Sequence, residues 1–253
     1  MSLPLPPVAP AVPLVAVAHG SRDPRAAATV EALMDTVRLA LPGLPVRAAY
    51  LDHAAPTLAG ALSGLAEAVV LPLLLTEAYH SRVDIPGALA EVAARQPRLR
   101  VHRGTTLGPH PLLIDALERR LAEAGVAAGD PRTAVVLLSA GSSDHRANAT
   151  VAGIARQWAA RRGWWSVSAA YASAAAPAPG DEVRRLLAAG APRVVVAPYL
   201  LAPGYFADKT RAAALAAGAE VVADVLGAAP EVADVLLERY GQALRADERS
   251  ATA

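Results

Sequence analysis

One pattern of apolar segments, loops and helices occurs twice in this chain. An apolar segment followed by a Gly-Ser loop and an acidic residue lies at 14–23 and again at 135–144, an offset of 121 residues. The same offset maps Tyr50 onto Tyr171. Later landmarks recur in the same order, with residues 69–72 matched by 195–198 and residues 107–108 matched by 226–227. Ordered landmarks of this kind indicate an internal duplication, so we expect two similar units of about equal size.

Within each unit, short apolar segments alternate with segments of helical periodicity. In the first half we expect strands at residues 13–18, 45–50, 68–75 and 99–103, and helices at 25–41, 57–65, 84–95 and 109–124. Continuous apolar strands between helices are typical of parallel sheets that are covered on both faces. The predicted fold class is therefore α/β, with two similar lobes, each a parallel four-stranded sheet flanked by helices.

Gly, Ala, Asp and Pro without periodicity at residues 125–131 predict a linker between the units. We expect an N-terminal lobe over 13–125 that carries the functional site, and a degenerate second lobe over 132–245. Residues 1–12 are rich in proline and are expected to form a disordered leader, and residues 246–253 a tail.

Composition excludes several kinds of chemistry. The chain has no cysteine, which rules out disulfides, thiolate catalysis, cysteine-bound zinc and iron–sulfur clusters. The net charge of +1 gives no bulk reason to expect a nucleic acid or an acidic membrane surface as partner. No apolar run approaches the length of a membrane span and no signal peptide is recognisable, so a cytoplasmic location is expected.

A duplicated chain allows the two copies to be compared within one molecule. Gly20 and Gly141 are both retained, as a tight turn after a strand requires. Three ionisable residues of the first copy, in contrast, have counterparts that cannot ionise near neutral pH. The pairs are His19 and Ala140, Asp52 and Ser173, and His80 and Phe206. The turn geometry therefore does not demand these ionisable groups.

His19, Asp52 and His80 each follow one of the predicted strands of the first lobe. The carboxyl ends of parallel strands border the crevice in which ligands bind, so we expect the three side chains to converge there. Two imidazoles and a carboxylate form an open site suited to a divalent ion such as iron, cobalt or nickel. The plain alternative is that an isolated histidine such as His19 only caps a turn.

Several short motifs together resemble the sirohydrochlorin chelatases of the CbiX type. The similar segments are 19–22 (HGSR), 50–52 (YLD), 55–57 (APT), 72–75 (PLLL) with His80, 84–86 (DIP), and 199–206 (YLLAPGYF) in the second half. These class II chelatases are related to the ferrochelatases and insert cobalt or ferrous iron into sirohydrochlorin, for cobalamin or siroheme synthesis. The resemblance covers nearly the whole chain and corresponds to the long, two-lobed members.

What the resemblance implies can be assigned position by position. His19 and His80 would hold the entering metal, which is a substrate, and no organic cofactor is expected. Asp52 stands where the family usually has a glutamate and is one methylene shorter. A second histidine that often follows the metal-binding one falls at Val83.

The tetrapyrrole substrate carries several carboxylates, so we expect it to bind Ser21, Arg22 and Arg82 near the metal site. Lys209 and Arg211 of the second lobe are candidates for the opposite wall. We expect a monomer or a homodimer, since two fused lobes can supply a whole cleft.

The remaining histidines are expected to lie outside the site. We expect His53 to point away from Asp52, His102 to be a core or edge residue of its strand, and His145 to be exposed; His110 is a weaker candidate for the cleft.

Two alternative functions stay open at the level of sequence. The first is a metal or tetrapyrrole carrier without catalysis, which the replacements at Asp52 and Val83 leave possible because they affect proton transfer more than metal binding. The second is phosphoryl transfer with His19 as nucleophile. The loop lacks the spaced glycines and the lysine of a P-loop, which disfavours that second reading.

Overall fold

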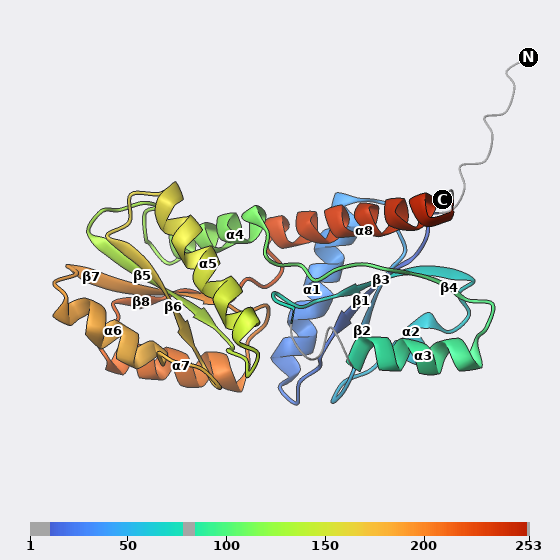
Figure 1. Ribbon diagram of the computed structural model, residues 1–253, viewed down its shortest axis with the longest axis horizontal. Helices are drawn as coiled ribbons and strands as arrows, with labels where there is room; N and C mark the ends of the chain where they lie inside the picture. The colour runs from blue at the N-terminus through green and yellow to red at the C-terminus, as the bar shows by residue number, and fades with distance from the viewer. Residues whose placement is uncertain (1–10, 78–83, 252–253) are drawn as a thin grey trace, which may run out of the picture.

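A computed structural model describes residues 11–77 and 84–251 of the chain and shows two lobes side by side (Figure 1). The first copy of the repeat contains β1 (Leu14–Ala18), α1 (Pro24–Ala40), β2 (Val46–Tyr50), α2 (Leu58–Leu62), β3 (Glu67–Pro72), α3 (Ile85–Arg95), β4 (Arg100–Arg103) and α4 (Pro111–Glu123). The second copy contains β5 (Thr133–Ser139), α5 (His145–Arg161), β6 (Ser166–Tyr171), α6 (Pro179–Ala188), β7 (Arg193–Tyr199), α7 (Tyr205–Ala216), β8 (Val221–Val222) and α8 (Pro230–Ala251).

Within the described residues the strands form two four-stranded parallel sheets, ordered β2-β1-β3-β4 and β6-β5-β7-β8. The strand register confirms the duplication. Leu14 pairs with Val69 in the first sheet, and Val135 pairs with Val195 in the second. Leu14 and Val135 are 121 residues apart, and Val69 and Val195 are 126 residues apart. These are the offsets that the matching segments of the sequence show. The predicted α/β class and the two similar lobes are thus confirmed.

Strand β3 is shorter than the sequence predicts. It ends at Pro72, whereas the apolar run continues to Leu75. The neighbouring strand β1 ends at Ala18, and its last pairing to β3 joins Val17 to Pro72. Since no strand continues alongside, the residues after Pro72 leave the sheet and become a loop at its carboxyl edge.

The last helix of each copy packs on the other lobe, which the predicted linker at residues 125–131 does not anticipate. Helix α4 contacts β7, and its Glu118 accepts a 2.9 Å hydrogen bond from the indole of Trp158 in α5. Helix α8 returns to pack against α1, β3 and β4 of the first lobe (Figure 1). The tyrosine hydroxyl of Tyr240 there donates to the carbonyl of Val12 over 2.8 Å. Periodicity identifies an apolar helix face, but it does not identify the sheet that covers that face.

This exchange joins the two halves into one folding unit. A single buried cluster runs from the first lobe, with Leu33 and Leu71, to the second lobe, with Leu137 and Trp158. Helix α8 continues to Ala251, so the expected tail from residue 246 instead extends the last helix. Most of the expected leader lies outside the described residues. No helix in the described part of the chain has the length and apolar character needed to cross a bilayer.

Candidate functional site

A cleft of about 550 Å³ lies where the carboxyl ends of the two sheets face each other. The first lobe contributes His19 after β1 and residues 73–76 after β3. The second lobe contributes residues 139–143, 173–174 and 199–201. This volume is within the range of small-molecule sites, and the position at the strand ends is where open parallel sheets bind ligands.

The loops that follow β1 and β5 share one backbone skeleton. In the first copy the amide of Asp52 donates to the carbonyl of His19 over 2.9 Å, and in the second the amide of Ser173 donates to the carbonyl of Ala140 over 3.0 Å. Positive φ angles also match, at 61° for His53 and 57° for Ala174.

Each of these loops needs a glycine at its second position. Gly20 has φ +96°, and a Cβ placed there would lie 1.7 Å from the carbonyl oxygen of Asp52. Gly141 has φ +81°, with the corresponding distance to Ser173 at 1.9 Å. In each copy, the glycine lies so close to the loop after the next strand that no side chain fits at its position.

Against this shared skeleton, the side chain at the first position of the loop differs between the two copies. His19 is exposed and lines the cleft, and its counterpart Ala140 lines it from the other side. The backbone hydrogen bond at this position is kept when alanine replaces histidine, so the turn does not depend on an imidazole. This disfavours the reading of His19 as a simple turn residue.

Asp52 and His53 form a pair, contrary to the expectation that His53 points away. The Nε2 atom of His53 lies 3.2 Å from Oδ2 of Asp52, and the amide of His53 donates to Oδ1 over 2.7 Å. The positive φ of His53 folds the ring back over its neighbour. The signal available in the sequence was an imidazole directly after a carboxylate at a strand end. The cleft lining includes His19 but not Asp52.

Ser21 has a role in the loop itself. Its Oγ accepts a hydrogen bond from the amide of Asp23 over 3.1 Å, and Ser142 accepts one from Asp144 over 3.0 Å in the second copy. A contact that both copies retain belongs to the fold, so the geometry favours a structural role for Ser21. Arg22 is exposed.

His80 and Arg82 lie outside the described residues, so their predicted roles stay predictions. Among the residues that the structure does describe, no three His, Asp or Glu side chains are close enough together to hold a metal ion. A complete set of metal ligands would therefore need a contribution from outside the described residues or from the substrate.

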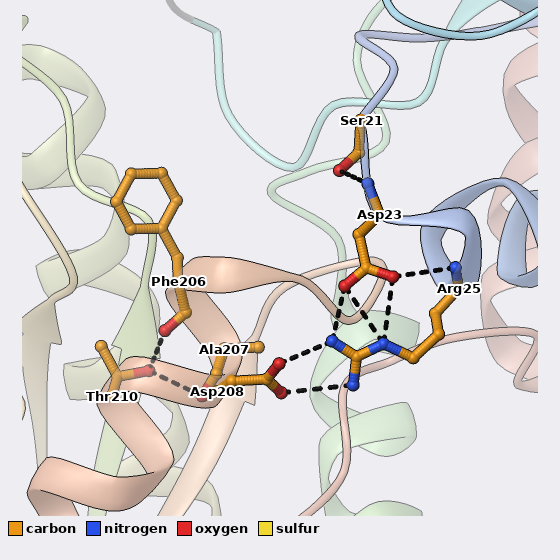
Figure 2. Close-up of polar contacts among 7 residues, drawn as sticks. All are labelled: Ser21, Asp23, Arg25, Phe206, Ala207, Asp208 and Thr210. Atoms are coloured by element: carbon orange, nitrogen blue, oxygen red, sulfur yellow. Dashed lines mark hydrogen bonds and ion pairs between the residues drawn. The ribbon is translucent and has the colours of Figure 1, made fainter.

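An ion pair connects the two lobes beside the cleft (Figure 2). Arg25, in the first turn of α1, contacts Asp23 and reaches across to Asp208 in the first turn of α7, with 2.5 Å between Nη2 and Oδ2 of Asp208. The hydrogen bonds from Arg25 hold the pKa of Asp23 below its usual value. Asp23 also caps α1, since its carboxylate accepts from the amide of Arg25 over 3.0 Å. The ion pair thus connects the capped end of α1 to α7.

A buried hydroxyl makes a second contact between the lobes, at the cleft wall. Tyr199, at the end of β7, donates to the carbonyl of Leu75 over 3.1 Å. Burial raises the pKa of Tyr199 far above its usual value, so the phenol remains a donor. Sequence reasoning did not single out this residue.

The two cations expected on the opposite wall are already engaged. Lys209 lies over the ring of Tyr205, with 5.8 Å between Nζ and the ring centroid. Arg211 donates to Asp224 over 3.0 Å and lines a separate cavity of about 770 Å³ between α1 and α7.

Two of the remaining histidines make contacts within the fold. His102 is buried in β4 with Nε2 2.6 Å from Glu67, as expected for a core residue. His110 caps α4 through Nδ1 and contacts Glu238 of α8 through Nε2 at 3.0 Å. His145 is exposed, as predicted.

Comparisons with known proteins agree with the repeat. A family model described as CbiX matches residues 13–124 and, a second time, residues 134–243. The chain is 30% identical over 200 residues to a sirohydrochlorin cobaltochelatase of Priestia megaterium, which covers 74% of this chain and 63% of that protein. It is 32% identical over 145 residues to a sirohydrochlorin ferrochelatase of Bacillus subtilis, which covers 55% of this chain and 54% of that protein. The chain thus spans less than two thirds of these two relatives.

Solved structures show the same fold. SirB from Bacillus subtilis with Fe³⁺ superposes with a TM-score of 0.80 at 24% identity, over 92% of this chain and 95% of that one. The structure of CbiX, described as the terminal enzyme of siroheme biosynthesis in denitrifying bacteria, superposes with a TM-score of 0.66 at 24% identity, over 91% and 98% of the two chains.

Proposed function

The chain belongs to the CbiX family, and we propose on that premise that it inserts a divalent metal ion, Co²⁺ or Fe²⁺, into sirohydrochlorin or a related tetrapyrrole. It would act as a lyase of the cobaltochelatase or ferrochelatase kind. The metal and the tetrapyrrole are both substrates, and the reaction needs no organic cofactor. The product would serve cobalamin or siroheme biosynthesis.

One observation carries this proposal. Two loops with the same backbone face each other across one cleft, and only the loop of the first copy carries an imidazole there, on His19. The loop backbones are alike in the two copies, so we attribute this difference to chemistry that requires one site. A metal that approaches from one side of a flat macrocycle requires ligands on that side alone.

The chemistry suits the residues present. Metal insertion requires an ion to exchange its temporary ligands for pyrrole nitrogens, and a neutral imidazole binds such ions without sequestering them. His19 would hold the ion at the cleft, with His80 as its proposed second ligand. The cleft between two lobes that share one core could also bend the macrocycle toward the ion, which raises the reactivity of the nitrogen lone pairs.

Two pyrrole protons must leave as the metal enters, and Asp52 is our proposed acceptor. Its carboxylate is 61% exposed and lies against the imidazole of His53, so a proton received by the pair can pass to solvent. Arg22 and Arg82 remain our proposed contacts for the carboxylates of the tetrapyrrole. We further propose that Ni²⁺ is accepted, that the protein acts in the cytoplasm as a monomer or homodimer, and that it binds neither nucleic acid nor membranes.

The test is the rate of metal insertion, followed by absorbance. Sirohydrochlorin mixed with Co²⁺, Fe²⁺ or Ni²⁺ should change its spectrum faster with the protein than without it, and a decarboxylated porphyrin should react more slowly. Equal rates with and without protein would contradict the proposed function. Tight binding of sirohydrochlorin combined with equal rates would instead identify a carrier, and turnover of a phosphate ester without metal would revive phosphoryl transfer.

A further inference from the structure

The chain's single phenylalanine lies at the edge of the cleft, in the first turn of α7. Phe206 is 46% exposed, and it lines the same cavity as His19. Tyr205 beside it is 71% exposed and meets its ring edge-on, with 5.8 Å between the centroids. Helix α7 packs on its own lobe through Thr210 and Ala214, so the fold does not require an apolar ring at position 206.

The position of Phe206 within the repeat is informative. Strands β3 and β7 correspond at an offset of 126 residues, and the same count maps position 206 onto His80 in the sequence. The second copy thus has an aromatic ring where the first copy has the histidine proposed as metal ligand. We expect such a difference if the first copy binds the metal and the second copy binds the macrocycle.

The turn that carries Phe206 is held in place. The hydroxyl of Thr210 donates to the carbonyl of Phe206 over 2.6 Å. Two residues after Phe206, Asp208 is held by Arg25 of the first lobe, and Figure 2 shows the ring of Phe206 and the carboxylate of Asp208 leaving the turn in different directions. The ion pair therefore fixes the ring relative to the lobe that carries His19.

We propose that Phe206 is a substrate-binding residue whose ring packs against the face of the conjugated macrocycle. This inference rests on the proposed function, since it takes the tetrapyrrole as the ligand. The rest of the cleft is lined mainly by aliphatic and hydroxyl side chains. Of the two other rings in the lining, Tyr199 is only 1% exposed and His19 is the proposed metal ligand, so Phe206 offers the accessible hydrocarbon ring. A half-exposed ring loses its remaining contact with water when a flat conjugated ligand covers it, and aromatic pairs gain further through their quadrupoles.

The role differs from recognition of the carboxylates. A ring contact reads the flat conjugated core, so it should contribute equally to macrocycles whose side chains differ. Arginine contacts would instead discriminate between these ligands by charge. The second lobe would pack against the face of the macrocycle, while the first lobe supplies the metal and binds the carboxylates.

The experiment measures the Kd of metal-free sirohydrochlorin by fluorescence, together with the KM values for sirohydrochlorin and Co²⁺, using the full-length chain. The variants are Phe206→Ala and Phe206→Leu. Leu215→Ala is the matched control, because Leu215 lies on the same helix, is 44% exposed and does not line the cleft. We expect Phe206→Ala to raise the Kd and the KM for sirohydrochlorin about three- to tenfold, with the KM for Co²⁺ unchanged. Phe206→Leu should recover part of this loss, and Leu215→Ala should match the unmodified protein.

The inference would be overturned by an unchanged Kd for Phe206→Ala, by equal increases in both KM values, or by full affinity in Phe206→Leu. None of these three results bears on the proposed function, which depends only on whether the unmodified protein accelerates metal insertion. Binding of sirohydrochlorin without acceleration would overturn the proposed function, while the Kd of the variants would still decide the role of Phe206. Absence of binding by the unmodified protein would overturn both.

Discussion

The hydroxyl of Tyr199 at the end of β7 donates a hydrogen bond to the carbonyl of Leu75, which follows β3, across 3.1 Å and 124 positions in sequence. This buried contact joins the carboxyl ends of β3 and β7 at the wall of the cleft. It links the geometry of the binding site to the packing of the lobes.

Replacing Tyr199 by phenylalanine should remove this link and leave the carbonyl of Leu75 without its donor. We expect a loss of about 1 kcal/mol in the free energy of unfolding, measured with urea, because a buried hydrogen bond contributes about that much. We also expect weaker binding of sirohydrochlorin. Tyr240→Phe is the control, since its hydroxyl makes a comparable bond to Val12 away from the cleft. Equal sirohydrochlorin affinities in the two variants would show that the Tyr199 contact does not shape the cleft.

Removing the charge of Asp208 should release α7 from Arg25. We expect Asp208→Asn to raise the Kd for sirohydrochlorin about twofold, in the range of an exposed ion pair, and to leave the affinity unchanged when Phe206 is already alanine. Asp35→Asn is the matched control, because Asp35 pairs with Arg38 within α1 alone. Additive effects of the Asp208 and Phe206 substitutions would mean that the ion pair does not position the ring.

Glu118 should make the stability of the protein depend on pH. Burial raises the pKa of this carboxyl, but hydrogen bonds from Arg162 and Trp158 outweigh burial and hold the pKa below its ordinary value of 4.5. The folded state therefore gains stability above pH 4.5 and loses it as the pH falls through the lowered pKa.

Glu118→Gln should accordingly lower the free energy of unfolding by about 2 kcal/mol at pH 7 and by less at pH 4, as measured by urea titration. The exposed Glu91→Gln serves as the control. A deficit of equal size at both pH values would show that the charge of Glu118 is not what stabilises the contact between α4 and α5.

Gly20→Ala should be far more destabilising than Gly43→Ala. Both glycines have similar positive φ angles, +96° and +92°, but a Cβ at Gly43 would meet nothing within 4 Å. Gly43→Ala should therefore lose about 1–2 kcal/mol through backbone strain, and Gly20→Ala should lose considerably more because its Cβ collides with Asp52. Similar thermal midpoints for the two variants would contradict the close approach of the loops after β1 and β2.

The sequence predicted much of the architecture because its signals are local or repeated. Apolar runs predicted the strands, and the matching of residues 69–72 with 195–198 predicted the equivalence of β3 and β7 that the two sheets show. The exchange of α4 and α8 could not be predicted, since an amphipathic helix such as that containing Glu118 shows equally good periodicity on either lobe.

The site was predicted in part. The comparison of copies identified His19, which lines the cleft, and the structure adds a loop contact of Ser21 that Ser142 also makes. The pairing of Asp52 with His53 was missed, because it depends on a positive φ in a residue other than glycine. The places of Phe206 and Tyr199 in the cleft depend on how the lobes meet, which no local pattern encodes.

The central claim is that the first copy alone carries the metal chemistry, and the rate of Co²⁺ insertion by His19→Ala tests it most directly. Loss of a metal ligand should lower the rate at least about 100-fold, more than loss of a group that merely orients a ligand. The Kd for metal-free sirohydrochlorin should stay unchanged, and His145→Ala, which removes an exposed imidazole from the second copy, should retain the full rate. A His19→Ala variant that inserts Co²⁺ at the rate of the unmodified protein would contradict the account.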